Sequence, residues 1–126
     1  MKTIVNWQLP IKTASEGNSS ENHFVKAKRH RIQKRRITDQ FLKERPKITF
    51  PCRVILTRIA PRSLDSHDNL PMSLKWVADA IAENLIPGKA VGRADDSKEI
   101  TWEYRQKKGK VREYAVIIEL WSDDET

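Results

Sequence analysis

The stretch NLPMSLKWVADAIAENL, residues 69–85, carries the clearest helical pattern in this sequence. On a helical wheel its large apolar side chains share one face, which predicts an amphipathic helix closed by Pro87-Gly88. The opposite face carries Lys75 and Asp79 and lies directly above Asp68. The predicted core residues of this helix are Leu70, Leu74, Val77, Ile81 and Leu85.

The elements on either side of this helix follow from periodicity and turn residues. Residues 2–10 predict a short strand, residues 22–45 a helix that ends before Pro46, and residues 50–59 a strand. Two more strands are expected at 99–106 and 111–120, joined as a hairpin by the turn 107–110. The order β-α-β-α-β-β predicts an α+β fold in which a four-stranded mixed sheet packs against two helices. We expect one domain, 1–126, with a frayed acidic tail at 122–126.

Composition and charge restrict the partners. The net charge is +7 and the pI about 9.7, which favours a phosphate-bearing partner or an anionic membrane surface. No apolar run approaches the ~20 residues that span a bilayer, and residues 1–7 lack the apolar region of a secretory signal. We therefore expect no membrane partner and a cytoplasmic protein that joins the nucleoid when it binds DNA. Cys52 is the only cysteine, which excludes an intramolecular disulfide and a cysteine-rich zinc site.

The helix expected at 22–45 is unusually basic. Seven of the eleven residues 26–36 are Lys or Arg, and such a concentration of like charges invites an anion. A merely solvated face is the alternative. We expect contacts with DNA phosphates from Lys26, Lys28, Arg29, Arg31, Lys34, Arg35 and Arg36.

Two carboxylate clusters stand out in this basic chain. Asp65 and Asp68 precede the helix 69–85, and the pair Asp95-Asp96 follows it. Carboxylates are ligands for Mg²⁺, with Mn²⁺ a possible substitute, and such an ion assists phosphodiester hydrolysis. Lys75 is placed to stabilise the negative charge that develops on the phosphate. Neighbouring groups that can assist are His67, Asn69, Asp79 and Asp95.

Each part of this pattern also has a simpler explanation. Asp68 or Asn69 can be an ordinary helix N-cap, and Asp95-Asp96 an ordinary turn. Lys75 and Asp79 can form an exposed ion pair one helical turn apart. His67 can be merely exposed. The joint occurrence of these residues favours the metal-dependent chemistry over the separate explanations.

The chain resembles the RusA-like Holliday junction resolvases, which are common in prophages. The resemblance rests on Ser15-Glu16-Gly17-Asn18, the loop 64–70, Lys75 with Asp79, and Asp95-Asp96 before the last strands. It implies a small homodimeric endonuclease that cuts branched DNA with Mg²⁺. By position it implies metal-binding and catalytic roles for Asp68 and Asp96, a metal-binding role for Asp65, a catalytic role for Lys75 and a DNA contact for Asn18.

The resemblance has two departures. Two residues separate Asp65 from Asp68 where the family has one, and Ser66 stands at the closer position. Lys75 also follows Asp68 at a longer interval. Ser66 at the position of a family aspartate favours an alternative hypothesis: a non-catalytic, basic nucleic-acid-binding protein whose acidic loops are structural.

Overall fold

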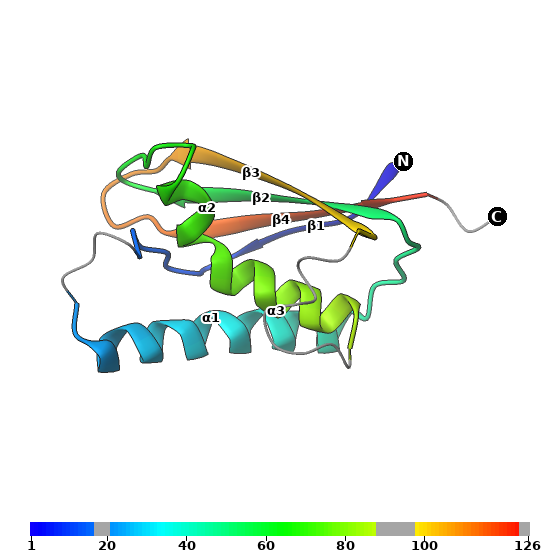
Figure 1. Ribbon diagram of the computed structural model, residues 1–126, viewed down its shortest axis with the longest axis horizontal. Coiled ribbons are helices and arrows are strands. Elements are labelled where there is room, and N and C mark those ends of the chain that lie inside the picture. The colour runs from blue at the N-terminus through cyan, green and yellow to red at the C-terminus, as the bar shows by residue number, and fades with distance from the viewer. Residues whose placement is uncertain (17–20, 88–97, 124–126) are drawn as a thin grey trace.

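The computed structural model describes residues 1–16, 21–87 and 98–123. The described residues form four strands and three helices, arranged as Figure 1 shows. The predicted α+β class with a four-stranded mixed sheet is confirmed, but the expected number of helices, two, is wrong. In chain order the elements are β1 (Lys2–Leu9), α1 (His23–Glu44), β2 (Cys52–Ala60), α2 (Asn69–Ser73), α3 (Lys75–Leu85), β3 (Ile100–Lys108) and β4 (Ala115–Ser122).

The sheet has the strand order β1-β4-β2-β3. β4 is antiparallel to both β1 and β2, whereas β3 is parallel to β2. The expected hairpin between the last two strands is therefore wrong, because β2 lies between them. The burial of the strands explains the arrangement: β2 is almost entirely buried and takes the middle of the sheet, whereas β3 carries many exposed polar residues and forms an edge.

Gly109 lies where a hairpin turn was expected. Its amide donates to the carbonyl oxygen of Ala60, at the end of β2. A Cβ at Gly109 would lie 2.8 Å from Glu113 Oε1 and 3.0 Å from Ile59 Cγ2. A glycine is thus required by the close approach of the chain to β2 and not by a tight turn between paired strands.

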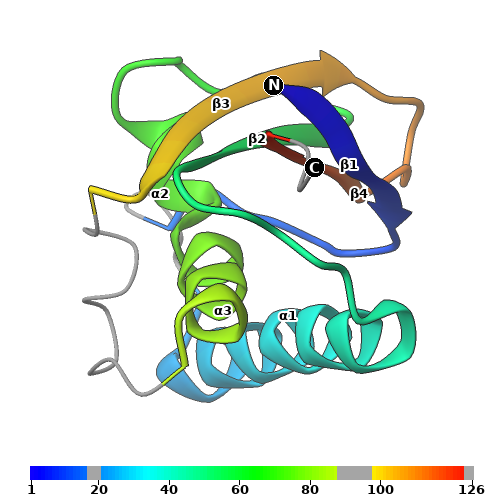
Figure 2. The same cartoon turned by 90° about the vertical axis from the view of Figure 1, so that its right-hand side faces the viewer.

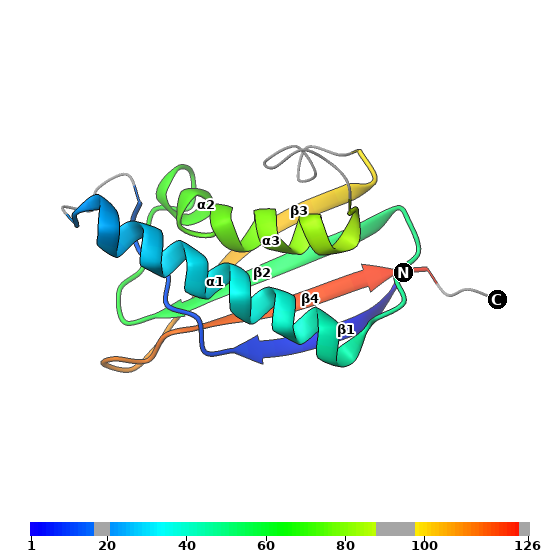
Figure 3. The same cartoon turned by 90° about the horizontal axis from the view of Figure 1, so that it is seen from below.

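The helices form one layer against one face of the sheet. Figure 2 shows the sheet above α1 and α3, and Figure 3 shows these two helices side by side in front of the strands. Leu70, Leu74, Val77 and Ile81 are buried as predicted, and Leu85 is partly buried at the end of α3. No helix among the described residues is long and apolar enough to cross a membrane.

The single helix expected at 69–85 is divided at Leu74. Ser73 Oγ donates to the carbonyl oxygen of Leu70 at 2.7 Å. The amide of Leu74 donates to the carbonyl oxygen of Pro71 at 3.1 Å. The side chain therefore takes the acceptor that a regular helix would offer to Leu74, which tightens the turn. Regular bonding resumes when the amide of Ala78 donates to Leu74.

α1 lies within the range predicted for the basic helix. Asn22 caps its start by accepting from the amide of Val25 at 3.0 Å, and Arg45 ends it in the left-handed region at φ 44°. Its buried stripe consists of Arg29, Gln33, Ile37 and Phe41, spaced four residues apart.

The first two residues of the predicted frayed tail are held by contacts with the rest of the chain. Ser122 is the last residue of β4 and is buried. The Asp123 carboxylate lies 3.3 Å from the amino group of Met1, and the Asp123 carbonyl oxygen accepts from Thr49 Oγ1 at 2.7 Å. Residues 124–126 of the predicted tail lie outside the described residues.

Candidate functional site

Three of the predicted site residues line one pocket beside α2 and β3. We call it the α2–β3 pocket. It measures about 590 Å³ and is lined by His67, Asp68, Pro71, Met72, Lys75, Ala78 and Tyr104. The fold thus brings the predicted metal ligand Asp68, the predicted catalytic Lys75 and His67 to the same cavity. Tyr104 comes from β3, and its place beside the helix follows from strand pairing that the sequence pattern did not reveal.

Asp68 is available for chemistry in this pocket. It stands at the N-cap position of α2, yet its side chain makes no capping hydrogen bond. The simple N-cap explanation of this carboxylate is therefore not supported. Lys75 is the exposed first residue of α3, and its Nζ lies 5.9 Å from the centre of the Trp76 ring. Neither side chain forms an ion pair within the part of the chain that the structure describes.

Asp65 does the capping instead. Its Oδ1 accepts from the amides of His67 at 3.1 Å and Asp68 at 3.0 Å, and its Oδ2 accepts from Asn69 Nδ2 at 2.6 Å. These bonds, the one from the Asp68 amide foremost, lower the pKa of the Asp65 carboxyl. The metal-binding role of Asp65 stays a prediction. A metal ion would have to compete with these hydrogen bonds for the Asp65 oxygens, and one of the bonds also engages Asn69.

Asp79 was expected on the exposed face above Asp68, and this is wrong. The residue is only 7% exposed and lines a different cavity, between α1 and α3. Asp79 lies on α3 and lines this cavity together with His30 and Lys34 of α1, the helix that packs against α3. We call this cavity of about 160 Å³ the α1–α3 pocket; its lining residues are His30, Arg31, Lys34, Trp76, Asp79, Ala80 and Glu83.

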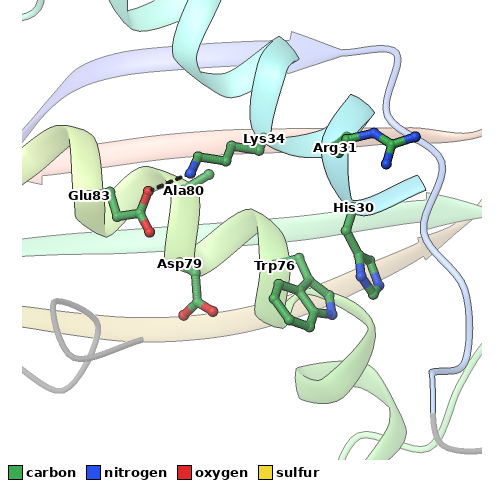
Figure 4. Close-up of a pocket in the computed structure, with 7 residues that line it drawn as sticks. All are labelled: His30, Arg31, Lys34, Trp76, Asp79, Ala80 and Glu83. Atoms are coloured by element: carbon green, nitrogen blue, oxygen red, sulfur yellow. Dashed lines mark ion pairs between the residues drawn. The ribbon is translucent and has the colours of Figure 1, made fainter. Parts of the chain in front are cut away.

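Aromatic stacking and ion pairing hold the α1–α3 pocket together (Figure 4). The rings of His30 and Trp76 stack with their centres 4.2 Å apart, and Lys34 Nζ lies 3.3 Å from Glu83 Oε2. His30 Nε2 also lies 3.1 Å from Glu16 Oε1. Trp76 is therefore a contact between the two helices.

Arg29 was predicted to contact DNA, and the structure contradicts this. The residue is 8% exposed; its guanidinium donates to Glu16 at 2.8 Å and pairs with Glu21. Burial opposes the charged form, but these carboxylates outweigh it and raise the pKa of Arg29. Glu16 belongs to the segment 15–18 and precedes the basic helix in the sequence. An acidic residue just before so basic a helix was the signal that could have predicted this ion pair.

The other predicted DNA contacts on α1 face outward. Lys28, Arg31 and Arg36 are exposed, and Lys26 is half-buried. The remaining two exposed cations have partners: Lys34 with Glu83, and Arg35, whose Nε lies 3.9 Å from Asp39 Oδ2. The predicted contact Asn18 and the predicted site residues Asp95 and Asp96 lie outside the described residues.

The described residues fit Mg²⁺ in a limited way. Within 1–16, 21–87 and 98–123 no group of three His, Cys, Asp or Glu side chains is placed to hold an ion. Mg²⁺ is commonly bound through one or two carboxylates, waters and substrate phosphates, without a complete protein cage. Asp68 in the α2–β3 pocket supplies one such carboxylate, so the arrangement fits an ion shared with a phosphate substrate.

Comparison with protein-family models, curated proteins and solved structures found no match for this chain.

Proposed function

We propose that the chain is a RusA-like, Mg²⁺-dependent endonuclease that hydrolyses phosphodiester bonds in branched DNA. The observation that carries this proposal is the shared position of Asp68 and Lys75 on the α2–β3 pocket. The Asp68 carboxylate has no capping role, and Lys75 has no ion-pair partner among the described residues. These two side chains therefore suit the binding of a cation and a phosphate better than a structural role.

Each residue has a distinct role in this mechanism. Asp68, together with Asp96, would hold Mg²⁺ through carboxylate oxygens, and the bound ion would supply polarisation of a phosphoryl oxygen and an activated water. The Lys75 ammonium holds a non-bridging phosphate oxygen and stabilises the negative charge that grows as the phosphorus is attacked. His67, which lines the same pocket, would move a proton between water and solvent.

The exposed cations of α1 complete the proposal. Lys28, Arg31 and Arg36 offer charge to backbone phosphates without taking part in hydrolysis. We also propose a homodimer, because a four-way junction presents two symmetry-related strands and a twofold protein matches them. Light scattering at micromolar concentration should then report twice the chain mass of 14.7 kDa. A monomer that still cuts both strands in concert would contradict the proposed homodimer but not the proposed endonuclease activity.

The test is cleavage of a synthetic four-way junction, with Mg²⁺ or Mn²⁺ against EDTA, set beside metal titration. Asp68→Asn and Asp96→Asn should lower metal affinity and reduce cleavage at least about 100-fold, while DNA binding survives. Lys75→Ala should abolish cleavage without loss of metal. Asp39→Asn, an exposed carboxylate on α1, is the matched control and should cleave normally. Wild-type turnover in all three site variants would end this assignment.

One observation favours a second candidate, a non-catalytic nucleic-acid-binding protein. Asp65 is occupied in shaping its own loop, so the described part of the chain contributes a single freely available carboxylate, Asp68, at the α2–β3 pocket. This candidate predicts DNA binding with no cleavage in either metal, and Asp68→Asn without effect on any property.

A further inference from the structure

A buried arginine without an acidic partner lies on the other side of the loop 61–68. Arg58, in the second half of β2, is 5% exposed. Its Nε donates to Thr13 Oγ1 at 2.9 Å and its Nη1 to the carbonyl oxygen of Arg62 at 2.7 Å. Both acceptors are neutral, and no carboxylate among the described residues forms an ion pair with Arg58.

Such a guanidinium is costly to bury. Removal from water disfavours the charged form and lowers the pKa of Arg58, although arginine stays protonated at any ordinary pH. Of its five N–H donors, two are used in the bonds to Thr13 and Arg62. A buried charge is ordinarily paired, so this one calls for an anion that the described residues do not supply.

The surroundings of Arg58 form a cavity suited to an anion. We call it the Arg58 pocket; it measures about 460 Å³, and Lys12, Ser15, Arg62 and Tyr114 are among its lining residues. Ser15 Oγ is buried and has no hydrogen-bond partner among the described residues. A polar atom of this kind needs a ligand or a water to satisfy it.

The charges of this lining favour an anion as well. Three cations, Lys12, Arg58 and Arg62, face the cavity, against one carboxylate, Glu21. Glu21 is already paired with Arg29, so it compensates a charge outside the cavity. Lys12 Nζ lies 5.0 Å above the Tyr114 ring, which holds its ammonium at the pocket.

We infer that the Arg58 pocket binds a phosphate group, held by the free N–H donors of Arg58, by Ser15 Oγ and by the charges of Lys12 and Arg62. A planar guanidinium matches two phosphate oxygens at once, and the neutral acceptors Thr13 and Arg62 fix the orientation of that group. The group is either a phosphate of a DNA backbone or a free phosphate. Since Leu64 lines this pocket and Asp68 lines the α2–β3 pocket, one short loop separates the two cavities.

The probe for the test is inorganic phosphate. We expect millimolar phosphate to raise the melting temperature of the wild-type protein above that in sodium chloride of equal ionic strength, and to shift the Nε–Hε NMR signal of Arg58. Arg58→Met should lose both responses. Lys12→Gln with Arg62→Gln changes only exposed side chains and should weaken phosphate binding about tenfold. Lys107→Gln, a matched exposed cation on β3, should bind phosphate as the wild type does.

The source of the phosphate is decided with a fluorescent DNA oligonucleotide. If phosphate competes with it and Arg58→Met weakens its binding, the pocket holds the DNA backbone. If neither occurs while inorganic phosphate still binds through Arg58, the pocket holds a free phosphate. The inference is overturned if Arg58→Met, or the double variant should Arg58→Met not fold, keeps the full phosphate response, or if phosphate acts no differently from chloride. None of these results depends on cleavage activity.

Discussion

The helix α1 and the loop 61–68 with its neighbours both carry conspicuous charge, but the fold uses that charge differently. On α1, Arg29 is held by two carboxylates, Lys34 pairs with Glu83, and Arg35 lies near Asp39. Around the loop, Arg58, Asp68 and Lys75 form no ion pair in the described parts of the chain. The density of charge therefore does not identify a binding site. What identifies it is charge that the protein leaves uncompensated.

The largest expected effect separates the two buried arginines. Arg29→Met removes the partner of Glu16, which is itself only 10% exposed, and should lower the free energy of unfolding by about 3–5 kcal/mol. Arg58→Met removes a charge with no acidic partner and should leave stability within about 1 kcal/mol of the wild type. Urea denaturation measures both.

A matched control tests the cause of that difference. Arg29→Met combined with Glu16→Gln and Glu21→Gln should recover part of the lost stability, because the stranded carboxylates are gone. Equal losses for the two single variants would break the comparison between a compensated and an uncompensated arginine.

The next effect concerns DNA affinity. Replacing Lys28, Arg31 and Arg36 with Ala removes exposed cations that have no ion-pair partner among the described residues. The slope of log K against log salt should flatten by about 2.7, which is three phosphates at about 0.9 each, without loss of folding. The control is Lys107, Lys108 and Lys110 changed to Ala, exposed cations away from α1. An equal change in slope for the control would remove α1 as the DNA-binding face.

A smaller effect on stability is expected at Arg45, where the backbone conformation and not the charge decides the outcome. Arg45 ends α1 at φ 44° and ψ 57°, a conformation that costs a side chain about 1 kcal/mol and glycine almost nothing. Arg45→Gly should therefore raise the free energy of unfolding by about 0.5–1 kcal/mol. Arg45→Ala keeps the strain and should not stabilise the protein, so a gain in Arg45→Ala would show that the charge and not the backbone is unfavourable.

The smallest effect distinguishes two aspartates three residues apart. Asp65→Ala should destabilise the protein slightly, because it removes three hydrogen bonds at the start of α2, whereas Asp68→Ala should not. The pKa of Asp65 is lower in the folded state, so its contribution is present above about pH 4 and disappears as the pH falls through the folded-state pKa. A greater loss for Asp68→Ala in urea denaturation would restore its N-cap role.

Local periodicity predicted the elements and the buried face of the helical segment, because side-chain spacing within one element is a local property. It did not predict the partners of the strands. The residues of β3 suit an edge, but nothing in their pattern says that the neighbour is β2 and not β4. The helical wheel identifies the buried apolar face but not the burial of Asp79, because α1, a separate element, packs against α3 and shares a cavity with this residue.

The charged sites show the same limit. The sequence led to Asp68 and Lys75, which share a pocket, because their spacing lies within one helical segment. It misjudged Arg29, since the carboxylates that hold it come from residues before the helix. The sequence analysis did not select Arg58, although an arginine within the apolar run of β2 indicates a buried charge that needs a binding partner.

The place of β4 in the sheet has a consequence for the order in which the protein assembles. Among the described residues β1 pairs only with β4, so Lys2 pairs with Ser122 and Leu9 with Val116, each more than a hundred residues later in the chain. A chain emerging from the ribosome can form α1 and the parallel pair of β2 and β3, but its first strand has no neighbour until the last one is made. Closing so long a loop carries a large entropic cost, and contacts this distant in sequence make folding slow. The exposed edges of β1 and β2 are then the surfaces at which another protein can interfere during synthesis.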